Sequence, residues 1–233
     1  MNTLTTNTLG DDDATRERML PLIDHTLLTP EATPQQVDAH MREARELGLS
    51  AVCLRPSVLP DDAQGLRLVT VCGFPSGAHE TAVKAFEAER ALARGAHDID
   101  MVIGLGAVKA HDWSAVRAEV RTLRDVVPSD RVLKVIIEAA VLTDDEIIAC
   151  CRIGQEIGVD YMKTSTGYHP AGGASLADVA LMSRVLEGQV LVKASGGIRT
   201  RAQAEAFLDA GAARLGVSGT RALLTGSSTA DAY

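Results

Sequence analysis

Segments typical of β-strands alternate with segments typical of α-helices along almost the whole chain. The strand-like runs are short and rich in β-branched and apolar residues, and helix-like segments separate them. Central runs such as 132–137 are largely apolar, as expected for strands that are covered on both faces. Such alternation requires a parallel sheet with crossover helices, so the sequence predicts an α/β fold.

Six helices have clear start and stop signals. In Thr33-Pro34-Gln35-Gln36 a capping-box spacing coincides with proline at the first helical position, and the apolar stripe that follows ends at Gly48. The same signals predict helices at 82–94, 113–126, 143–158, 175–188 and 200–211. Strands are expected at 22–24, 50–54, 68–72, 99–103, 132–137, 161–162, 190–192 and 213–217.

The number of these units favours a closed (β/α)8 TIM barrel. About eight units follow one another without a linker, and 233 residues is close to the roughly 250 typical of this fold. An open doubly wound sheet is the alternative, but Gly104-Leu105-Gly106 lacks the third glycine of a dinucleotide-binding fingerprint. We expect a single barrel domain at residues 16–223, a polar N-terminal tail at 1–15 and a flexible C-terminal tail at 224–233.

Charge and composition favour a small-molecule partner over a nucleic acid or a membrane. The net charge is −8, aromatic residues make up 3% of the chain, and Lys and Arg form no clustered run. No apolar run approaches the roughly 18 residues of a membrane span, and residues 1–13 do not resemble a signal peptide. The adjacent Cys150 and Cys151 suit a reducing compartment. We therefore expect a cytoplasmic protein, and a homodimer would suit its size.

Charged residues on the predicted strands mark a candidate site, because active sites of this fold lie at the C-terminal ends of the strands. Asp24 is expected at the end of the first strand, and Asp100 lies within the fourth. Lys163 and Lys193 belong to the sixth and seventh strands. A single lysine in a strand is most often salt-bridged or has its ammonium group in solvent. Two on successive strands, with carboxylates on others, favour a chemical role.

Lys163 and Lys193 are expected to converge, because neighbouring strands lie about 5 Å apart. Each ammonium group disfavours the charge of the other, and burial acts in the same direction, so one amine is expected to be neutral enough to attack a carbonyl. Asp100 could then exchange the protons of Schiff-base formation, or it could form a plain salt bridge. Lys134 and Glu138, four residues apart, are expected on the same side of the fifth strand.

Glycine-rich segments follow the last two strands. Ser195-Gly196-Gly197 leads into the helix expected at 200–211, and Ser218-Gly219-Thr220 follows the eighth strand. Loops in these positions commonly bind phosphate in barrels through backbone N–H groups. As ordinary turns the glycines would have no functional meaning, but their paired position favours a phosphate site.

Metal and cysteine chemistry are not expected. Cys53 and Cys72 lie in apolar strands, where a buried, inert thiol is the commoner case. No histidine pair has the close sequence spacing of a zinc site. The six histidines are scattered at His25, His40, His79, His97, His111 and His169.

Six motifs together resemble the deoxyribose-phosphate aldolase family, in order from about residue 20 to about residue 220. They are Ile23-Asp24-His25-Thr26-Leu27-Leu28, Gly73-Phe74-Pro75-Ser76-Gly77-Ala78, Asp98-Ile99-Asp100-Met101-Val102-Ile103, Lys134-Val135-Ile136-Ile137-Glu138, Lys163-Thr164-Ser165-Thr166-Gly167 and Lys193-Ala194-Ser195-Gly196-Gly197-Ile198-Arg199.

The resemblance implies roles for individual residues. Lys163 corresponds to the Schiff-base lysine and Lys193 to the second lysine that lowers its pKa. Asp100 corresponds to the acid/base aspartate, and Asp24 to a supporting member of the same proton relay. The phosphate contacts implied by matching positions are Gly167, Gly196, Gly197, Ser218 and Gly219. Further candidates at the site are Thr166, Lys134 and the C-terminal Tyr233.

The reaction implied by the resemblance is the reversible cleavage of 2-deoxy-D-ribose 5-phosphate into acetaldehyde and D-glyceraldehyde 3-phosphate, in deoxyribonucleotide catabolism, without a metal or organic cofactor. The sequence departs from the family pattern at Arg55, Gly104, Ala139-Ala140 and Tyr168, the last standing where some members carry Lys. Two alternatives therefore stay open: a related class I aldolase of altered aldehyde specificity, and a barrel that binds a sugar phosphate without turning it over.

Overall fold

Eight parallel strands close into a barrel in the computed structural model, which describes residues 15–226. Each strand pairs with its neighbours in chain order, and the first pairs with the last. The TIM-barrel prediction is therefore confirmed. The strands are β1 (Ile23–Leu27), β2 (Ala51–Leu54), β3 (Arg67–Cys72), β4 (Asp98–Val102), β5 (Val132–Ile136), β6 (Tyr161–Lys163), β7 (Leu191–Ser195) and β8 (Arg214–Val217).

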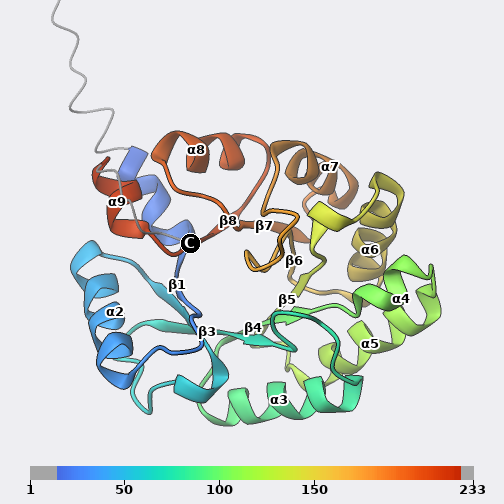
Figure 1. The fold of residues 1–233 in the computed structure, drawn as a ribbon, viewed down its shortest axis with the longest axis horizontal. Coiled ribbons are helices and arrows are strands. Elements are labelled where there is room, and N and C mark those ends of the chain that lie inside the picture. The colour runs from blue at the N-terminus through green and yellow to red at the C-terminus, as the bar shows by residue number, and fades with distance from the viewer. Residues whose placement is uncertain (1–14, 227–233) are drawn as a thin grey trace, which may run out of the picture.

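Helices surround the strands in a ring (Figure 1). The six helices predicted from the sequence are present, whereas the short helices α4 and α9 and the helical residues 15–19 were not predicted. Their bounds are α2 (Pro34–Leu47), α3 (Thr81–Ala93), α4 (Leu105–Lys109), α5 (Trp113–Val126), α6 (Asp144–Ile157), α7 (Leu176–Leu186), α8 (Arg201–Asp209) and α9 (Thr220–Thr225). Short 3-10 turns cover Leu20–Leu22 (η1), Pro56–Val58 (η2) and Ala139–Val141 (η3).

Local chemistry explains where α2 begins and ends. The Thr33 side chain accepts a hydrogen bond from the backbone N–H of Gln36, and the Gln36 side chain accepts one from the backbone of Thr33. Such a cap stabilises a helix by about 0.5–2 kcal/mol. At the other end Gly48 adopts a left-handed backbone with φ of 77°, which costs glycine little.

Alternation along the strands separates an apolar layer from a charged interior. In β4, Ile99 and Met101 are fully buried in the apolar core. Asp98 and Asp100 alternate with them and form ion pairs with a lysine of β5. Because successive side chains of a strand point to opposite faces, the two aspartates face the barrel interior.

Two expectations about strand positions are wrong. Asp24 does not end the first strand, because β1 continues to Leu27 through its pairing with β2. Lys134 and Glu138 do not share a strand face, because β5 ends at Ile136. Glu138 lies beyond that end in a left-handed conformation with φ of 52°.

The expected tails fall mostly on residues 1–14 and 227–233, which lie outside the described part of the chain, as does the candidate residue Tyr233. Helix α9 continues past residue 223, the expected end of the barrel domain, and the side chain of Leu224 is buried. The domain limits stay a prediction.

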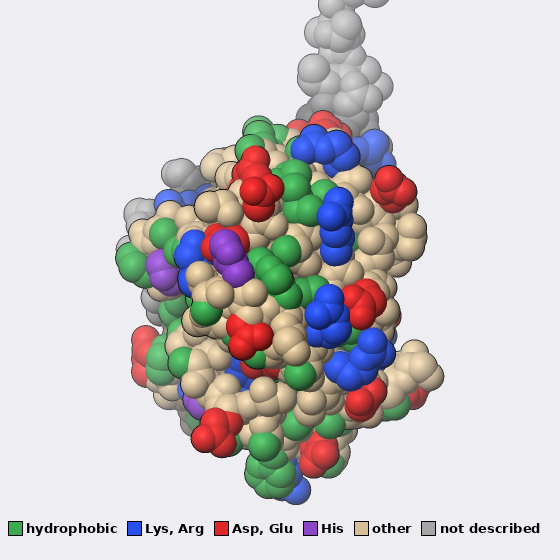
Figure 2. Space-filling model, turned by 90° about the vertical axis from the view of Figure 1, so that its right-hand side faces the viewer, with side chains coloured by type: hydrophobic (Ala, Val, Ile, Leu, Met, Phe, Trp, Pro, Cys, Tyr) green, Lys and Arg blue, Asp and Glu red, His purple; other side chains and the backbone are tan. Residues whose placement is uncertain are grey.

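The described surface carries charges of both signs. On the face shown in Figure 2, basic and acidic side chains are interspersed, which differs from the basic stripe typical of a nucleic-acid surface. Within residues 15–226, none of the helices combines the length and the apolar character needed to cross a membrane.

Candidate active site

A cluster of buried charged side chains occupies the barrel interior, and Asp100 of β4 is at its centre. One Asp100 oxygen lies 2.9 Å from Nζ of Lys163 and 2.7 Å from Nζ of Lys193. Its other oxygen lies 2.9 Å from Nζ of Lys134. The side chains of all four residues are at most 4% exposed. The structure therefore brings together the two lysines, the aspartate and the further candidate Lys134 of the sequence analysis.

The remaining charges in the cluster are also paired. Asp24 of β1 contacts Nζ of Lys193, and its second oxygen lies 2.6 Å from Nη1 of Arg214 in β8. Asp98 accepts a hydrogen bond from Lys134 at 2.5 Å. Because an isolated buried charge is costly, these contacts are what allows so many ionised groups in the barrel. Sequence reasoning missed Arg214, which is 190 positions from its partner Asp24.

Among the three lysines of the cluster, Lys163 alone has a lowered pKa. Burial lowers the pKa of Lys163, and the charge of Lys193 adds to this, although Asp100 partly opposes the shift. Burial would also lower the pKa of Lys193, but Asp100 and Asp24 outweigh it and the net shift is upward. The pKa of Lys134 is raised as well, chiefly by Asp100. Lys163 is thus the amine of this cluster best suited to lose its proton and become a nucleophile.

Both central carboxylates stay ionised at neutral pH. Burial would raise the pKa of Asp24, but Lys193, Lys134 and Arg214 outweigh it and lower the value to about 2. The pKa of Asp100 is held well below its ordinary value because the three neighbouring ammonium groups outweigh the effect of burial. Each carboxylate is therefore ionised and accepts hydrogen bonds from the ammonium groups beside it.

A cavity of about 430 Å³ opens above this cluster. Of the five clustered residues Asp24, Asp100, Lys134, Lys163 and Lys193, only Lys163 lines it. A volume of this size suits a small ligand. The cavity is also lined by all the phosphate candidates, which are Gly167, Gly196, Gly197, Ser218 and Gly219, and by Thr166.

Glycine is required where the phosphate candidates converge. Gly167, Gly196 and Gly197 have left-handed backbones with φ of 81°, 87° and 81°. A Cβ on Gly196 would lie 2.9 Å from Cα of Gly173 and 3.1 Å from Cα of Gly167, so the loops after β6 and β7 pack backbone against backbone. A side chain at these positions would therefore force the two loops apart.

Replacing Gly173 by alanine should disturb this loop packing. The new Cβ would stand 2.2 Å from the carbonyl oxygen of Gly196, so the loop after β7 must shift. We expect a loss of about 1–3 kcal/mol in the free energy of unfolding, measured with urea, and weaker phosphate binding. Gly106→Ala is the matched control, because a Cβ there meets nothing within 4 Å and alanine favours its helix. Equal stability of the two variants would contradict the prediction.

Glu138 organises the loop that follows β6. Its buried carboxylate accepts hydrogen bonds from Oγ1 of Thr166 at 2.5 Å and from the backbone N–H of Thr166 at 3.2 Å. The Thr166 hydroxyl in turn accepts one from the N–H of Tyr168 at 3.1 Å. Sequence reasoning gave Glu138 no such role, because the contact depends on the turn after β5.

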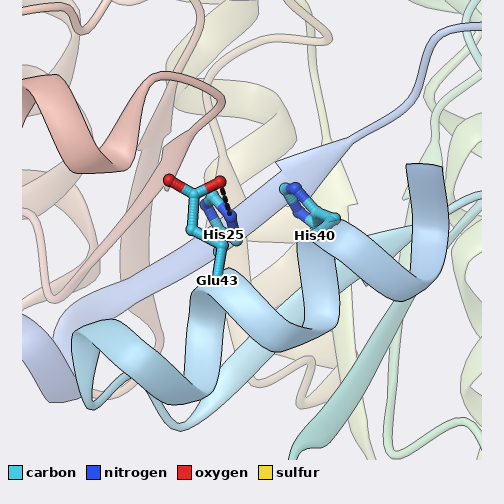
Figure 3. A group of neighbouring side chains, drawn as sticks. All are labelled: His25, His40 and Glu43. Atoms are coloured by element: carbon cyan, nitrogen blue, oxygen red, sulfur yellow. Dashed lines mark ion pairs between the residues drawn. The ribbon is translucent and has the colours of Figure 1, made fainter. Parts of the chain in front are cut away.

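Histidines far apart in the sequence meet beside the cavity. The rings of His25 in β1 and His40 in α2 stack with centroids 3.6 Å apart, and Glu43 lies next to them (Figure 3). These two histidines are separated in the sequence and meet because the fold packs α2 against β1. Ligand atoms of the three residues lie within 4.8 Å of one another. Parallel stacked rings are a poor ligand pair, however, because a metal ion lies in the plane of each imidazole that binds it.

The departures from the family pattern lie around the site rather than in the charged cluster. Tyr168 lines the cavity and makes an edge-to-face contact with Phe74. The backbone N–H of Gly104 donates to Glu119 at 2.7 Å, just beyond β4. Arg55 precedes η2, and Ala139 and Ala140 begin η3.

The pKa of the Cys53 thiol is raised by burial to about 11, as for an unreactive cysteine.

Comparison with known proteins gives the family. The family model of the DeoC/LacD family aldolases matches residues 18–225. The chain belongs to this family. It is 50% identical over 213 residues to a deoxyribose-phosphate aldolase of Kocuria rhizophila, covering 91% of this chain and 98% of that one. The corresponding protein of Nocardia farcinica is 51% identical over 212 residues, with coverage of 91% and 96%.

Solved structures agree with this assignment. A tetrameric deoxyribose phosphate aldolase from Aeropyrum pernix is 30% identical, with a TM-score of 0.84 and coverage of 96% of this chain and 97% of that one. An aldolase named QR15 is 34% identical, with a TM-score of 0.83 and coverage of 88% and 93%. This chain therefore shares both sequence and barrel geometry with aldolases, as the six motifs predicted.

Proposed function

We propose that this DeoC/LacD family member is a deoxyribose-phosphate aldolase, which cleaves 2-deoxy-D-ribose 5-phosphate reversibly into acetaldehyde and D-glyceraldehyde 3-phosphate. The observation that carries the proposal is the position of Lys163. It is the one lysine of the buried cluster with a lowered pKa, and the one that reaches the cavity. Names of relatives about 50% identical over most of the chain support the same reaction.

In the proposed mechanism the neutral amine of Lys163 attacks the C1 aldehyde carbon of the open-chain sugar. The carbinolamine loses water to form an iminium ion, which is the electron sink for cleavage. A base takes the proton of the C3 hydroxyl, the C2–C3 bond breaks, and D-glyceraldehyde 3-phosphate leaves. The enamine is then protonated at C2, and water hydrolyses the imine to release acetaldehyde. Because the imine accepts the electrons, the reaction needs no metal or organic cofactor.

Asp100 and Lys193 are the proposed proton carriers of this sequence. The Asp100 carboxylate lies 2.9 Å from Nζ of Lys163 and 2.7 Å from Nζ of Lys193, within reach of both for proton exchange. Asp24, paired with Lys193 and Arg214, supports the charge of the relay. Lys134 balances the second oxygen of Asp100.

The phosphate group is proposed to bind at the loops after β6, β7 and β8. The cavity that Lys163 lines is also lined by Gly167, Gly196, Gly197, Ser218 and Gly219. An extended sugar phosphate could therefore place its aldehyde carbon at Lys163 and its phosphate group at these loops. Backbone N–H groups would supply most of the donors. Tyr168 stands where some family members carry a lysine, so its side chain brings no positive charge to this loop. Aldehydes without a phosphate group should therefore be tested as alternative substrates.

The proposal is tested by incubating the protein with 2-deoxyribose 5-phosphate and measuring acetaldehyde release, then adding borohydride and mapping the reduced adduct. We expect acetaldehyde and an adduct on Lys163. Turnover of unphosphorylated aldehydes alone would point to the related aldolase of altered specificity. Ligand binding without product or adduct would point to the binding barrel and overturn the proposal.

The pH dependence should report the influence of Lys193 on Lys163. The amine of Lys163 reacts when neutral, so kcat/KM should rise with pH through its pKa, which lies below the ordinary 10.5. Lys193→Met removes a neighbouring positive charge and leaves Asp100 free to act more strongly on Lys163, so this pKa rises. We expect the acidic limb of the profile to move to higher pH. A limb at unchanged or lower pH would contradict the proposed coupling.

Assembly and location stay predictions. The homodimer expected from the sequence can be measured by light scattering at several concentrations. Small sugar phosphates and aldehydes are the proposed partners, in a cytoplasmic setting that suits deoxyribonucleotide catabolism.

A further inference from the structure

His25 is buried on the side of β1 opposite the charged cluster. Asp24 faces the barrel interior, and the next side chain along a strand points to the other face, here toward α2. The His25 side chain is 1% exposed. Burial and the neighbouring His40 and Arg221 lower its pKa to about 2, so the ring is neutral. The proposed aldolase mechanism does not use this ring.

The Thr220 hydroxyl makes two buried contacts. It lies 3.2 Å from the carbonyl oxygen of Val217, to which it can donate. It also shares a hydrogen bond with Nδ1 of His25, at 2.9 Å. The Nε2 atom of His25 has no hydrogen-bond partner and lies 3.7 Å from Glu43.

The ring of His25 is held from its face and its edge. His40 stacks on it at 3.6 Å between centroids, with an interplanar angle of 9°. Glu43 of α2 also lies 2.9 Å from Nε of Arg221 in α9, so the same carboxylate links α2 to α9. This packing limits the orientations of the imidazole and therefore the direction in which Nδ1 points toward Thr220.

Thr220 comes directly after the two residues that end the loop beyond β8. Ser218 and Gly219 line the cavity beside Lys163, and the side chain of Thr220 is completely buried. The hydrogen bond between His25 and Thr220 thus joins this loop to β1, across a separation of 195 residues. Because Thr220 is held in place directly after the loop, the backbone N–H groups of Ser218 and Gly219 keep one orientation.

We propose that His25 is a positioning residue for the phosphate subsite, acting through Thr220 to hold the loop of Ser218 and Gly219 in its binding conformation. This inference rests on the proposed function, because it assigns the loop to the substrate phosphate. It predicts that the His25–Thr220 contact affects phosphorylated ligands more than unphosphorylated ones.

The test compares kcat/KM for 2-deoxyribose 5-phosphate and for 2-deoxyribose in Thr220→Val, Thr220→Ser, His25→Leu and the double variant. Thr220→Val keeps the shape of the side chain but removes its hydroxyl, whereas Thr220→Ser keeps the hydroxyl. We expect the ratio of the two kcat/KM values to fall about tenfold in Thr220→Val and His25→Leu, the scale of one lost hydrogen bond. Thr220→Ser should stay within about twofold of the wild type, and the double variant should fall no further than either single one.

Calorimetric binding of inorganic phosphate gives a second, independent measurement. Its dissociation constant should rise by a similar factor in Thr220→Val and not in Thr220→Ser. A lower melting temperature of Thr220→Val with an unchanged kcat/KM ratio and unchanged phosphate affinity would mean a purely structural contact, and would overturn the inference. A wild-type protein that binds phosphate but does not cleave the sugar would instead contradict the proposed function, while the phosphate measurement would still decide the role of His25.

Discussion

Lys163→Met is expected to lower kcat for cleavage of 2-deoxyribose 5-phosphate by at least about 10⁴-fold, as when a covalent nucleophile is removed. The amine of Lys163 is the one in the buried cluster that reaches the cavity, so no neighbouring lysine of the cluster can replace it. Methionine has a similar length and carries no charge. Asp100 keeps its contacts with Lys134 and Lys193, so the fold should persist. Acetaldehyde release and borohydride trapping measure the effect.

Lys109→Met is the matched control for this substitution. Lys109 is 49% exposed and pairs with Glu146, away from the cavity lining. The substitution removes the same kind of side chain as Lys163→Met. We expect wild-type kcat and an adduct on Lys163. An adduct on Lys193 in the wild-type protein would exchange the two lysine roles. Activity of Lys163→Met above about 1% of the wild type would refute a covalent role for Lys163.

Asp100→Asn is expected to be damaging in two ways at once. The amide removes the one carboxylate that contacts three buried ammonium groups, so like charges face one another without compensation. Breaking a buried ion pair in this way typically costs about 3–5 kcal/mol in the free energy of unfolding. Loss of the proton carrier should also lower kcat by about 10²–10⁴-fold. Urea unfolding and initial rates separate the two effects.

The stability loss of Asp100→Asn should depend on pH. In the wild type the pKa values of Lys134 and Lys193 are raised, so their stabilising contribution is present below pH 10.5 and is lost at higher pH. In the variant Asp24 still pairs with Lys193 and Asp98 with Lys134, but without the Asp100 charge the upward pKa shifts are smaller and less of this stabilising contribution remains. The difference in the free energy of unfolding between the two proteins should therefore be largest below pH 10.5 and narrow as the pH rises above it.

Asp130→Asn serves as the control, because Asp130 is 69% exposed and forms an ion pair with the adjacent Arg131 at the surface. An exposed pair of this kind contributes at most about 1 kcal/mol. Similar unfolding curves for Asp100→Asn and Asp130→Asn would show that the charged cluster contributes little to folding.

The convergence of Lys163 and Lys193 could be predicted because it depends on local rules. Both lie in strands adjacent in sequence and in the sheet, and the structure pairs them directly in register. Capping signals placed the long helices for the same reason, since each cap involves residues three positions apart. The short helices α4 and α9 have too few turns to produce a periodic pattern.

Contacts that depend on closure of the barrel could not be predicted in this way. Arg214 meets Asp24, and Thr220 meets His25, because β8 returns to pair with β1. Neither end of the sequence carries a local sign of the other. The role of Glu138 was hidden for a related reason, because it depends on one left-handed residue after β5.

The pairing of β1 with β8 also sets an order of events during synthesis. Asp24 leaves the ribosome long before Lys193 and Arg214, the cations that later compensate its charge inside the barrel. Asp24 lacks both of these partners until β7 and β8 have been made, and until then the edge of β1 has no β8 to pair with. Apolar strands of a nascent chain can therefore pack together early, but the charge of Asp24 is fully paired only after the final strand has been made.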